Sequence, residues 1–304
     1  MPQRAAASAR RFLHCCYCCS SVDAATGFFT EAFGLEPRMR SSRDPIDGTQ
    51  MGFPGDVQTD TCFVYDARGP RVSPAIEIQE WIEPTTTGEP YVRPTNVGLH
   101  ALGIEVADVD AAVARATGLG AQVVGRTSAT AFMRDPTGIA LDVARGGAKD
   151  GAARLAHLRA TCSELGRSVD WYAGLGFEVL ETTRHARLAR DVRGIGTDAD
   201  VSWARLRLHD EPFELVLVEW HEPRSDGAAY GSGNHAGLYR FAIAVDDTRA
   251  AHAALTDAGL ITSPPPRLVT LPGTNVPDMW IAFLADPDGI VVELVERPRS
   301  AFIS

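Results

Sequence analysis

The chain has 304 residues, enough for two domains that each bury a core, and 45% of its residues are hydrophobic while 22% are charged. This composition excludes a disordered, collagen-like or coiled-coil chain. The net charge of −10 argues against nucleic acid as a partner, because neutralising phosphates needs clustered lysine and arginine, and no stretch reaches the roughly 20 apolar residues of a membrane-spanning helix.

The first half of the chain alternates strand and helix patterns. Residues 14–19 predict a strand, and residues 22–33 predict an amphipathic helix that Gly34 ends. The Gly-rich segment 144–153, which contains Lys149, is predicted to be a linker. A second helix is predicted at 109–118, and further strands at 61–65, 75–81, 99–106, 131–134 and 139–144.

The second half repeats this order. Helices are predicted at 165–173 and 248–258, and strands at 155–161, 201–206, 213–220, 239–245 and 290–295. Three sequence matches recur in the same order: an aromatic pair followed by a glycine (28–34 and 171–176), EW-x-EP (80–84 and 219–223) and DP-x-G (135–138 and 286–289). These matches predict a duplicated chain with domains at 1–146 and 152–304.

Each half divides again, so that the unit of one strand, one helix and several strands occurs four times. Four βαβββ modules with a histidine in the first strand, an aromatic pair before a glycine, and DP-x-G before a last strand that carries an acid resemble the vicinal oxygen chelate superfamily. Glyoxalase I, extradiol dioxygenases, epimerases and bleomycin-binding proteins belong to this superfamily. The resemblance covers about residues 11–297 and implies an α+β fold in which paired modules form two open, cupped β-barrels.

The resemblance also implies a metal site, with one ligand from the first and one from the last strand of each module. In the first half, the matching positions hold His14, Glu77 and Asp142, while Ala101 stands where a second histidine belongs. One imidazole and two carboxylates suit one divalent ion, Zn, Mn, Fe, Co or Ni, with water at the open positions. If module one pairs with module four instead, Glu293 replaces Asp142.

In the second half the implied ligand set is incomplete. His157 and Glu293 are retained, but Val216 and Arg240 stand at the other two positions, and a guanidinium repels a divalent ion. We therefore expect this half to be free of metal. The residues expected to bind substrate are His157, Arg159, Arg240, Glu293 and Glu105, with the two arginines holding an anionic group or forming a buried ion pair with Glu293.

Structural roles compete with these assignments. His14 in a strand is ordinarily a structural residue, Glu77 could be an acid solvated at an open barrel mouth, and Asp142 could form an ion pair. Cys16 and Cys18 share the face of His14, yet they are expected to be small buried residues. Because neighbouring cysteines on a strand point to opposite faces, a reduced, cytoplasmic protein is expected.

The function implied by the resemblance is metal-assisted proton transfer on a small molecule with adjacent oxygens. Such an isomerase or epimerase would act on an α-hydroxy ketone or a cyclitol of secondary metabolism, with Glu77 or Asp142 moving the proton. A metal-free protein that binds a drug or intermediate is the first alternative. An extradiol ring-cleavage dioxygenase is the second, and it requires a bulge that turns His100 inward. A monomer or a homodimer fits the duplicated chain.

Overall fold

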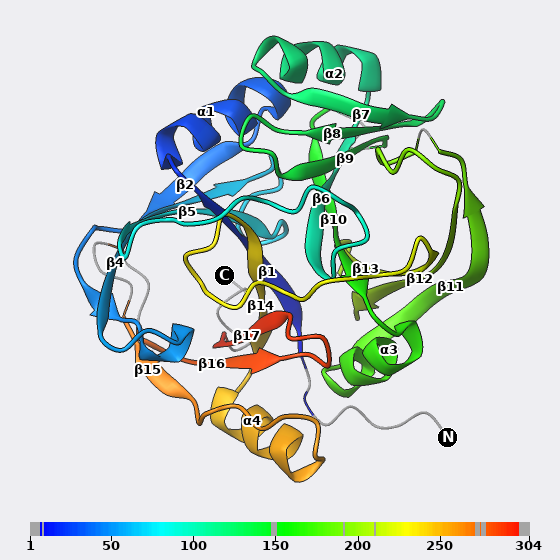
Figure 1. The fold of residues 1–304 in the computed structure, drawn as a ribbon. Coiled ribbons are helices and arrows are strands. Elements are labelled where there is room, and N and C mark those ends of the chain that lie inside the picture. Colours follow the sequence, from blue (N-terminus) through cyan, green and yellow to red (C-terminus); the bar gives the residue numbers. More distant parts are fainter. Residues whose placement is uncertain are drawn as a thin grey trace.

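Each quarter of the chain folds as a strand, a helix and a further set of strands (Figure 1). The computed structural model describes residues 7, 9–146, 151–190, 192–209, 211–270, 274 and 278–297, so Lys149 of the predicted linker lies outside the described residues. The predicted α+β class and the four successive modules are confirmed.

The four modules have the following elements. Module one comprises β1 (Arg11–Cys19), α1 (Val22–Phe33), β2 (Glu36–Arg40), β3 (Ile46–Asp47), the short 3-10 helix η1 (Thr49–Met51), β4 (Asp56–Tyr65) and β5 (Ala75–Glu83). Module two comprises β6 (Gly98–Val106), α2 (Val109–Gly118), β7 (Gln122–Arg126), β8 (Thr130–Arg134) and β9 (Ala140–Arg145). Module three comprises β10 (Arg154–Cys162), α3 (Leu165–Gly174), β11 (Phe177–Leu188), β12 (Ala199–Leu208) and β13 (Glu214–Glu222). Module four comprises β14 (Gly237–Val245), α4 (Thr248–Asp257), β15 (Arg267–Val269), β16 (Met279–Ala285) and β17 (Val291–Glu296).

Two curled sheets are built from modules that belong to different halves of the sequence. Sheet one joins modules one and four in the order β15-β16-β17-β14-β1-β5-β4-β2, and β3 pairs with β4. Sheet two joins modules two and three in the order β11-β12-β13-β10-β6-β9-β8-β7. The seams are antiparallel, β1 with β14 and β6 with β10. Module one therefore pairs with module four, and each predicted half contributes to both sheets. The boundaries 1–146 and 152–304 stay a prediction.

Alternation along β1 separates the two faces of sheet one. Cys15 and Tyr17 belong to the main core cluster, which also takes in the buried faces of the helices and the facing side chains of sheet two. His14 lines a cavity on the opposite face, and Cys16 and Cys18 lie in a smaller cluster on that side. The helices lie on the outside of the molecule, away from the hollows of the two curled sheets (Figure 1). None of the described helices is long and apolar enough to cross a membrane.

Two buried aspartates connect one sheet to the other. Asp135, in the turn between β8 and β9, accepts hydrogen bonds from the backbone N–H of Ile139 at 3.1 Å and from the hydroxyl of Tyr17 at 2.5 Å. Asp286, in the equivalent turn of module four, accepts one from the hydroxyl of Tyr172 at 3.1 Å. The repeated DP-x-G sequence thus supplies both a turn and a contact between modules.

The strands that the sequence pattern missed include all four edge strands, β2 and β15 of sheet one and β7 and β11 of sheet two. Their side chains are mostly exposed, so they lack the alternation of apolar and polar residues that marks a half-buried strand. The short β3 and the apolar β16 were also absent from the prediction.

Candidate functional site

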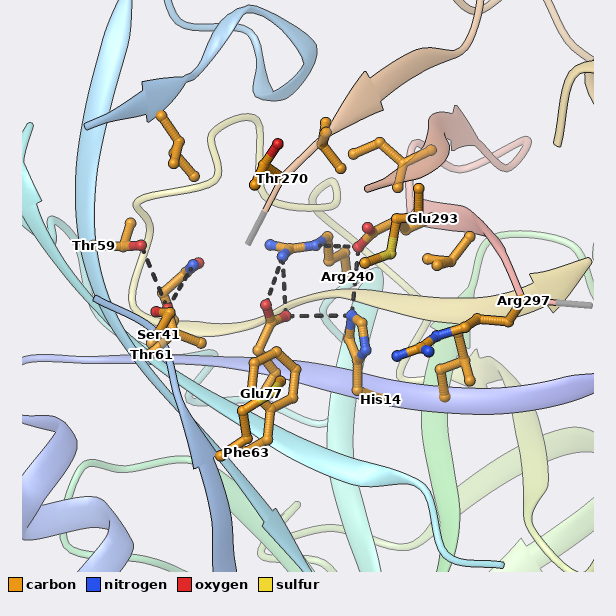
Figure 2. Close-up of a pocket in the computed structure, with 18 of the residues that line it drawn as sticks. His14, Ser41, Thr59, Thr61, Phe63, Glu77, Arg240, Thr270, Glu293 and Arg297 are labelled. Atoms are coloured by element: carbon orange, nitrogen blue, oxygen red, sulfur yellow. Dashed lines mark hydrogen bonds and ion pairs between the residues drawn. The ribbon is translucent and has the colours of Figure 1, made fainter. Parts of the chain in front are cut away.

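Four adjacent strands of sheet one place four polar side chains around one point (Figure 2). His14 comes from β1, Glu77 from β5, Arg240 from β14 and Glu293 from β17. The last three are only 5–6% exposed. A buried carboxylate is costly without a partner, so the contacts among these four side chains decide their ionisation.

Arg240 makes most of these contacts. Its Nη2 donates to both carboxylate oxygens of Glu77 at 3.0 and 2.9 Å, and its Nε donates to Glu293 at 2.9 Å. Its Nη1 lies 3.3 Å from the sulfur of Cys16. The guanidinium also lies over the ring of Phe283, 5.5 Å from the centroid. Each nitrogen of the guanidinium therefore has a protein partner.

The charges of this cluster stabilise one another. Burial opposes the ionisation of Glu293, but the charge of Arg240 and the contact with His14 lower the pKa of this carboxyl to about 2. Burial also opposes the charged form of Arg240, while Cys16, Glu77 and Glu293 hold its pKa well above the ordinary value. Arg240 and Glu293 are consequently an ionised pair at neutral pH.

The cluster lies in the wall of a cavity of about 580 Å³, here called cavity one. This volume suits a small organic molecule, for which sites span roughly 300–1,000 Å³. Threonine, serine and glutamine side chains add hydrogen-bonding groups on one side: Ser41, Thr59, Thr61 and Gln79. The remaining wall combines apolar side chains, among them Leu13, Met39, Phe63, Met279, Ile281 and Phe283, with charged ones: Arg11, Asp44, Asp47, Arg71, Arg267 and Arg297.

Sheet two has a second cavity of about 430 Å³, here called cavity two. His157 of β10 and Asp142 of β9 lie in its wall, with Nε2 and Oδ2 3.4 Å apart. Arg159, also on β10, donates to both oxygens of Asp142 at 2.8 and 3.1 Å. Burial opposes the ionisation of Asp142, yet Arg159 and His157 hold the pKa of its carboxyl well below the ordinary value.

Cavity two carries more cationic side chains than its acids neutralise at close range. The Nη1 of Arg159 is buried without a hydrogen-bond partner among the described residues, and so is the Nε of Arg193. Burial and the charge of Arg159 lower the pKa of Arg193 to about 10. Arg193 was not predicted from the sequence, because it lies in the loop between β11 and β12, where no periodic pattern places a side chain.

The structure brings together His14, Glu77, Glu293 and Arg240, the set expected when module one pairs with module four. It does not assemble His14, Glu77 and Asp142, because β9 belongs to sheet two and Asp142 lies in cavity two. The expectation that Arg240 shares a cavity with Arg159 is wrong for the same reason, since β14 lies in sheet one.

Two further predicted positions lie in sheet two. Glu105 of β6 lies in the wall of cavity two, near the end of the strand. His100 is buried, and its Nε2 lies 2.6 Å from the carbonyl of Arg93. Burial and the charge of Arg159 lower its pKa to about 3. A register shift beside this residue does not bring His100 into the described lining of cavity two.

Comparison with known proteins shows the family. Family models of the glyoxalase/bleomycin resistance protein/dioxygenase superfamily match residues 13–138 and residues 154–294. The chain belongs to this superfamily. No curated protein matches it.

Solved structures show that the superfamily fold extends over the whole chain. A variant of glyoxalase I from Zea mays has 20% identity and a TM-score of 0.66, with 95% of this chain and 94% of that chain covered. Another structure of glyoxalase I from Zea mays has 19% identity and a TM-score of 0.64, with coverages of 94% and 92%. At these identities the likeness concerns the fold alone.

A divalent metal ion does not fit among the superfamily's ligand positions in cavity one as the side chains stand. The carboxylates of Glu77 and Glu293 converge as metal ligands would, but Arg240 binds both oxygens of Glu77 and one of Glu293 and places a positive charge between them (Figure 2). A metal ion there would lose these oxygens to the guanidinium and be repelled by it. Of the four ligand positions on sheet two, Val216 and Ala101 offer no ligand atom, and Arg159 donates to both oxygens of Asp142, which leaves His157.

Proposed function

We propose that the protein binds a small, largely apolar organic molecule in cavity one, without a metal ion at the superfamily's ligand position. The observation that carries this proposal is the guanidinium of Arg240 between Glu77 and Glu293. The guanidinium is a fixed cation that neutralises the two carboxylates, as a metal ion would. Unlike a metal ion it offers no open position, because each of its nitrogens already has a protein partner. The cluster is thus a rigid polar wall rather than an open coordination site.

The lining of cavity one supports such a ligand. Met39, Phe63 and Ile281 offer apolar contact for the body of the molecule. Thr61 and Gln79 offer a hydroxyl and an amide group that would fix the orientation of the ligand, and the Oγ1 of Thr61 lies 3.3 Å from the Nε2 of Gln79. This is the composition of a binding pocket, in which apolar area supplies affinity and a few polar groups supply specificity.

The test uses a matched pair of cavity-filling variants. Leu13 of β1 and Ala156 of β10 precede His14 and His157 and line cavities one and two, respectively. The full chain is incubated with a library of neutral aromatic compounds, with and without EDTA, and bound compounds are identified by mass spectrometry. Binding that survives EDTA, is abolished by Leu13→Trp and is kept by Ala156→Trp supports the proposal. Binding that needs a metal, or that Ala156→Trp alone abolishes, contradicts it.

A second candidate function is proton transfer by His14 without a metal ion. The Nε2 of His14 is buried without a hydrogen-bond partner among the described residues, and it lies 3.5 Å from Glu77 and 3.4 Å from Glu293. The two carboxylates can only accept, so the imidazole proton belongs on Nε2 and the base would be Nδ1. Nδ1 would take a proton from the carbon beside a ketone and return it to the neighbouring carbon, as an isomerase requires, or to the same carbon, as an epimerase requires.

One measurement distinguishes proton transfer by His14 from the metal-dependent isomerase predicted from the sequence. Exchange of solvent deuterium into α-hydroxy ketones is followed by NMR in the presence of EDTA. Exchange that persists with EDTA and disappears in His14→Gln supports proton transfer by His14. Exchange that EDTA abolishes favours the metal-dependent reaction, and absence of exchange leaves binding as the function.

Cavity two supports an anion-binding role. The supporting observation is that buried guanidinium nitrogens of Arg159 and Arg193 have no hydrogen-bond partner among the described residues. Guanidinium groups pair with carboxylate and phosphate oxygens. Inorganic phosphate and succinate are the probes, and the melting temperature is the readout. Arg38→Gln, which removes an exposed charge outside cavity two, is the control. The role is supported if the anions raise the melting temperature of the wild type and of Arg38→Gln but not that of Arg193→Gln. Equal responses in all three proteins contradict it.

A further inference from the structure

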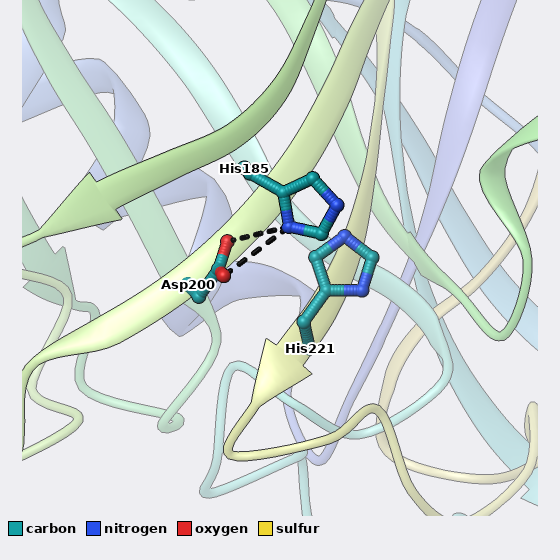
Figure 3. Close-up of side chains that lie close together, drawn as sticks. All are labelled: His185, Asp200 and His221. Carbon is teal, nitrogen blue, oxygen red and sulfur yellow. Dashed lines mark hydrogen bonds and ion pairs between the residues drawn. The ribbon is translucent and has the colours of Figure 1, made fainter.

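A cluster of two histidines and one aspartate lies on sheet two, outside the described linings of both cavities (Figure 3). His185 comes from β11, Asp200 from β12 and His221 from β13, three strands that are neighbours in the sheet. One nitrogen or oxygen atom from each residue lies within 4.8 Å of the other two. The Nδ1 of His185 is 3.2 Å from the nearer oxygen of Asp200.

Two irregularities of the sheet bring these side chains together. The β11–β12 register shifts between Thr183 and Ala186, and His185 lies at this shift with a positive φ of 51°. The β12–β13 register shifts between Asp200 and Val201, so that His221 lies opposite neither. A β-bulge turns a side chain away from the direction that regular alternation would give it. Here two such shifts flank the middle strand at Asp200.

The surroundings of His221 favour the tautomer that binds a metal. Its Nδ1 lies 3.5 Å from a carboxylate oxygen of Glu219, which can only accept, so the proton belongs on Nδ1. Its Nε2 then accepts from the hydroxyl of Ser202 at 2.7 Å. A carboxylate behind one ring nitrogen and a lone pair on the other is the usual arrangement around metal-binding histidines, and here an ion would displace the Ser202 hydroxyl from that lone pair.

We propose that His185, Asp200 and His221 form a binding site for a divalent ion of the zinc class. Two imidazoles and one carboxylate suit zinc and its neighbours in the transition series, whereas magnesium and calcium prefer oxygen ligands alone. Ligands about 2.0–2.1 Å from a tetrahedral zinc ion lie roughly 3.3 Å apart, close to the separation of the Nδ1 of His185 and the oxygens of Asp200, where an ion would replace the proton that Nδ1 donates to the carboxylate. Water would take the fourth position.

The site is open to ions from solvent and needs only a small adjustment. The side chain of His185 is 67% exposed, while those of Asp200 and His221 are 30% and 26% exposed. The two rings now stack with their centroids 4.5 Å apart, so His185 must rotate for both lone pairs to meet at one ion. An exposed side chain on an edge strand can make this rotation. The bound ion would tie together β11, β12 and β13.

The experiment is a zinc titration of the full chain after removal of metals, in competition with a chromogenic chelator. His185→Ala, Asp200→Asn and His221→Ala each remove one ligand. His209→Ala is the matched control, because His209 is an exposed histidine whose Nδ1 lies 3.3 Å from a carboxylate oxygen of Glu178, outside the proposed site. The melting temperature of each protein, with and without zinc, is the second readout.

We expect the wild type and His209→Ala to bind one equivalent of zinc and to melt at a higher temperature with zinc. Each ligand variant should bind zinc at least about 100-fold more weakly than the wild type. Loss of a group that only hydrogen-bonds to a metal ligand already lowers metal affinity about 10–100-fold, and loss of a ligand should cost more. Leu13→Trp, which fills cavity one, should bind as the wild type does, so this site is tested independently of the proposed function. If zinc binding is absent from the wild type, unchanged in His185→Ala and Asp200→Asn, or equally weakened in His209→Ala, the site does not exist.

Discussion

Arg240 is the residue on which the proposed metal-free function of cavity one rests. The resemblance assigns a histidine to this position of β14, where the other three positions hold His14, Glu77 and Glu293. A guanidinium reaches both carboxylates at hydrogen-bond distance and satisfies them without an ion. One side chain thereby ties two of the ligand positions into ion pairs, while the Nε2 of His14 has no hydrogen-bond partner among the described residues.

The variant Arg240→His should create a metal site in cavity one, because removing the guanidinium frees the oxygens of Glu77 and Glu293 for a cation. The measurement is zinc stoichiometry in a His221→Ala background, which removes the other proposed site. One added equivalent is expected, and Arg240→His/Glu293→Gln should lose it. A variant that is folded by circular dichroism yet binds no added zinc would show that other features of the cavity exclude the ion.

The acid stability of the protein should depend on Glu293. Its pKa is lowered to about 2 in the folded protein from an ordinary value of 4.5, so its contribution to stability is complete above pH 4.5 and is lost as the pH falls toward 2. We expect the free energy of unfolding to decrease over this interval more steeply in the wild type than in Glu293→Gln. Parallel pH profiles from urea unfolding would contradict this assignment.

Strands and helices differed in how well the sequence predicted them. The four helices and the central strands were predicted, since apolar residues recur along them at the helix or strand period. The edge strands were missed because solvent covers one side of them and polar residues are tolerated throughout. One register shift lies between the edge strand β11 and β12, beside His185, and the other lies between β12 and β13, beside His221. Periodicity does not predict such shifts, so no sequence pattern indicated the His–Asp–His cluster.

The turn between β8 and β9 should contribute measurably to stability through its bond to β1. Tyr17→Phe removes the hydroxyl that donates to the buried Asp135. Removing the partner of a buried acceptor costs about 1–3 kcal/mol, and we expect a loss of that size in the free energy of unfolding. Urea denaturation measures it, with Tyr172→Phe as the equivalent change at Asp286. An unchanged midpoint in Tyr17→Phe would exclude this role of the contact.

At the scale of the whole molecule, the decisive feature is the exchange of modules between the two halves of the chain. Sheet one requires β1 and β14, and sheet two requires β6 and β10. Each cavity is therefore built by residues about half a chain apart. Cavity one draws His14 and Glu77 from the first half, and Arg240 and Glu293 from the second.

Neither half should be a stable monomer alone. Residues 1–146 would expose the unpaired edges of β1 and β6, which invite pairing with a second copy. Size-exclusion chromatography and urea unfolding of residues 1–146, of residues 152–304 and of their mixture provide the test. We expect oligomers or non-cooperative unfolding of each half, and recovery of a cooperative 1:1 complex in the mixture. Two monomeric, cooperatively folding halves would contradict the importance of these seams.

The sequence by itself determined the modules, the central strands and the register that places His14, Glu77, Arg240 and Glu293 at equivalent positions. The modules and central strands follow from local periodicity and from the repeated motifs, and the site register follows from counting from those motifs to the positions that the superfamily resemblance implies. Only the tertiary structure decided which modules pair, and with that choice whether Asp142 or Glu293 joins His14. Local patterns carry no information on pairing, because every module presents a first strand of similar character to its partner. The contacts of Arg240 and the convergence of His185, Asp200 and His221 likewise depend on strands that meet only in the folded sheets.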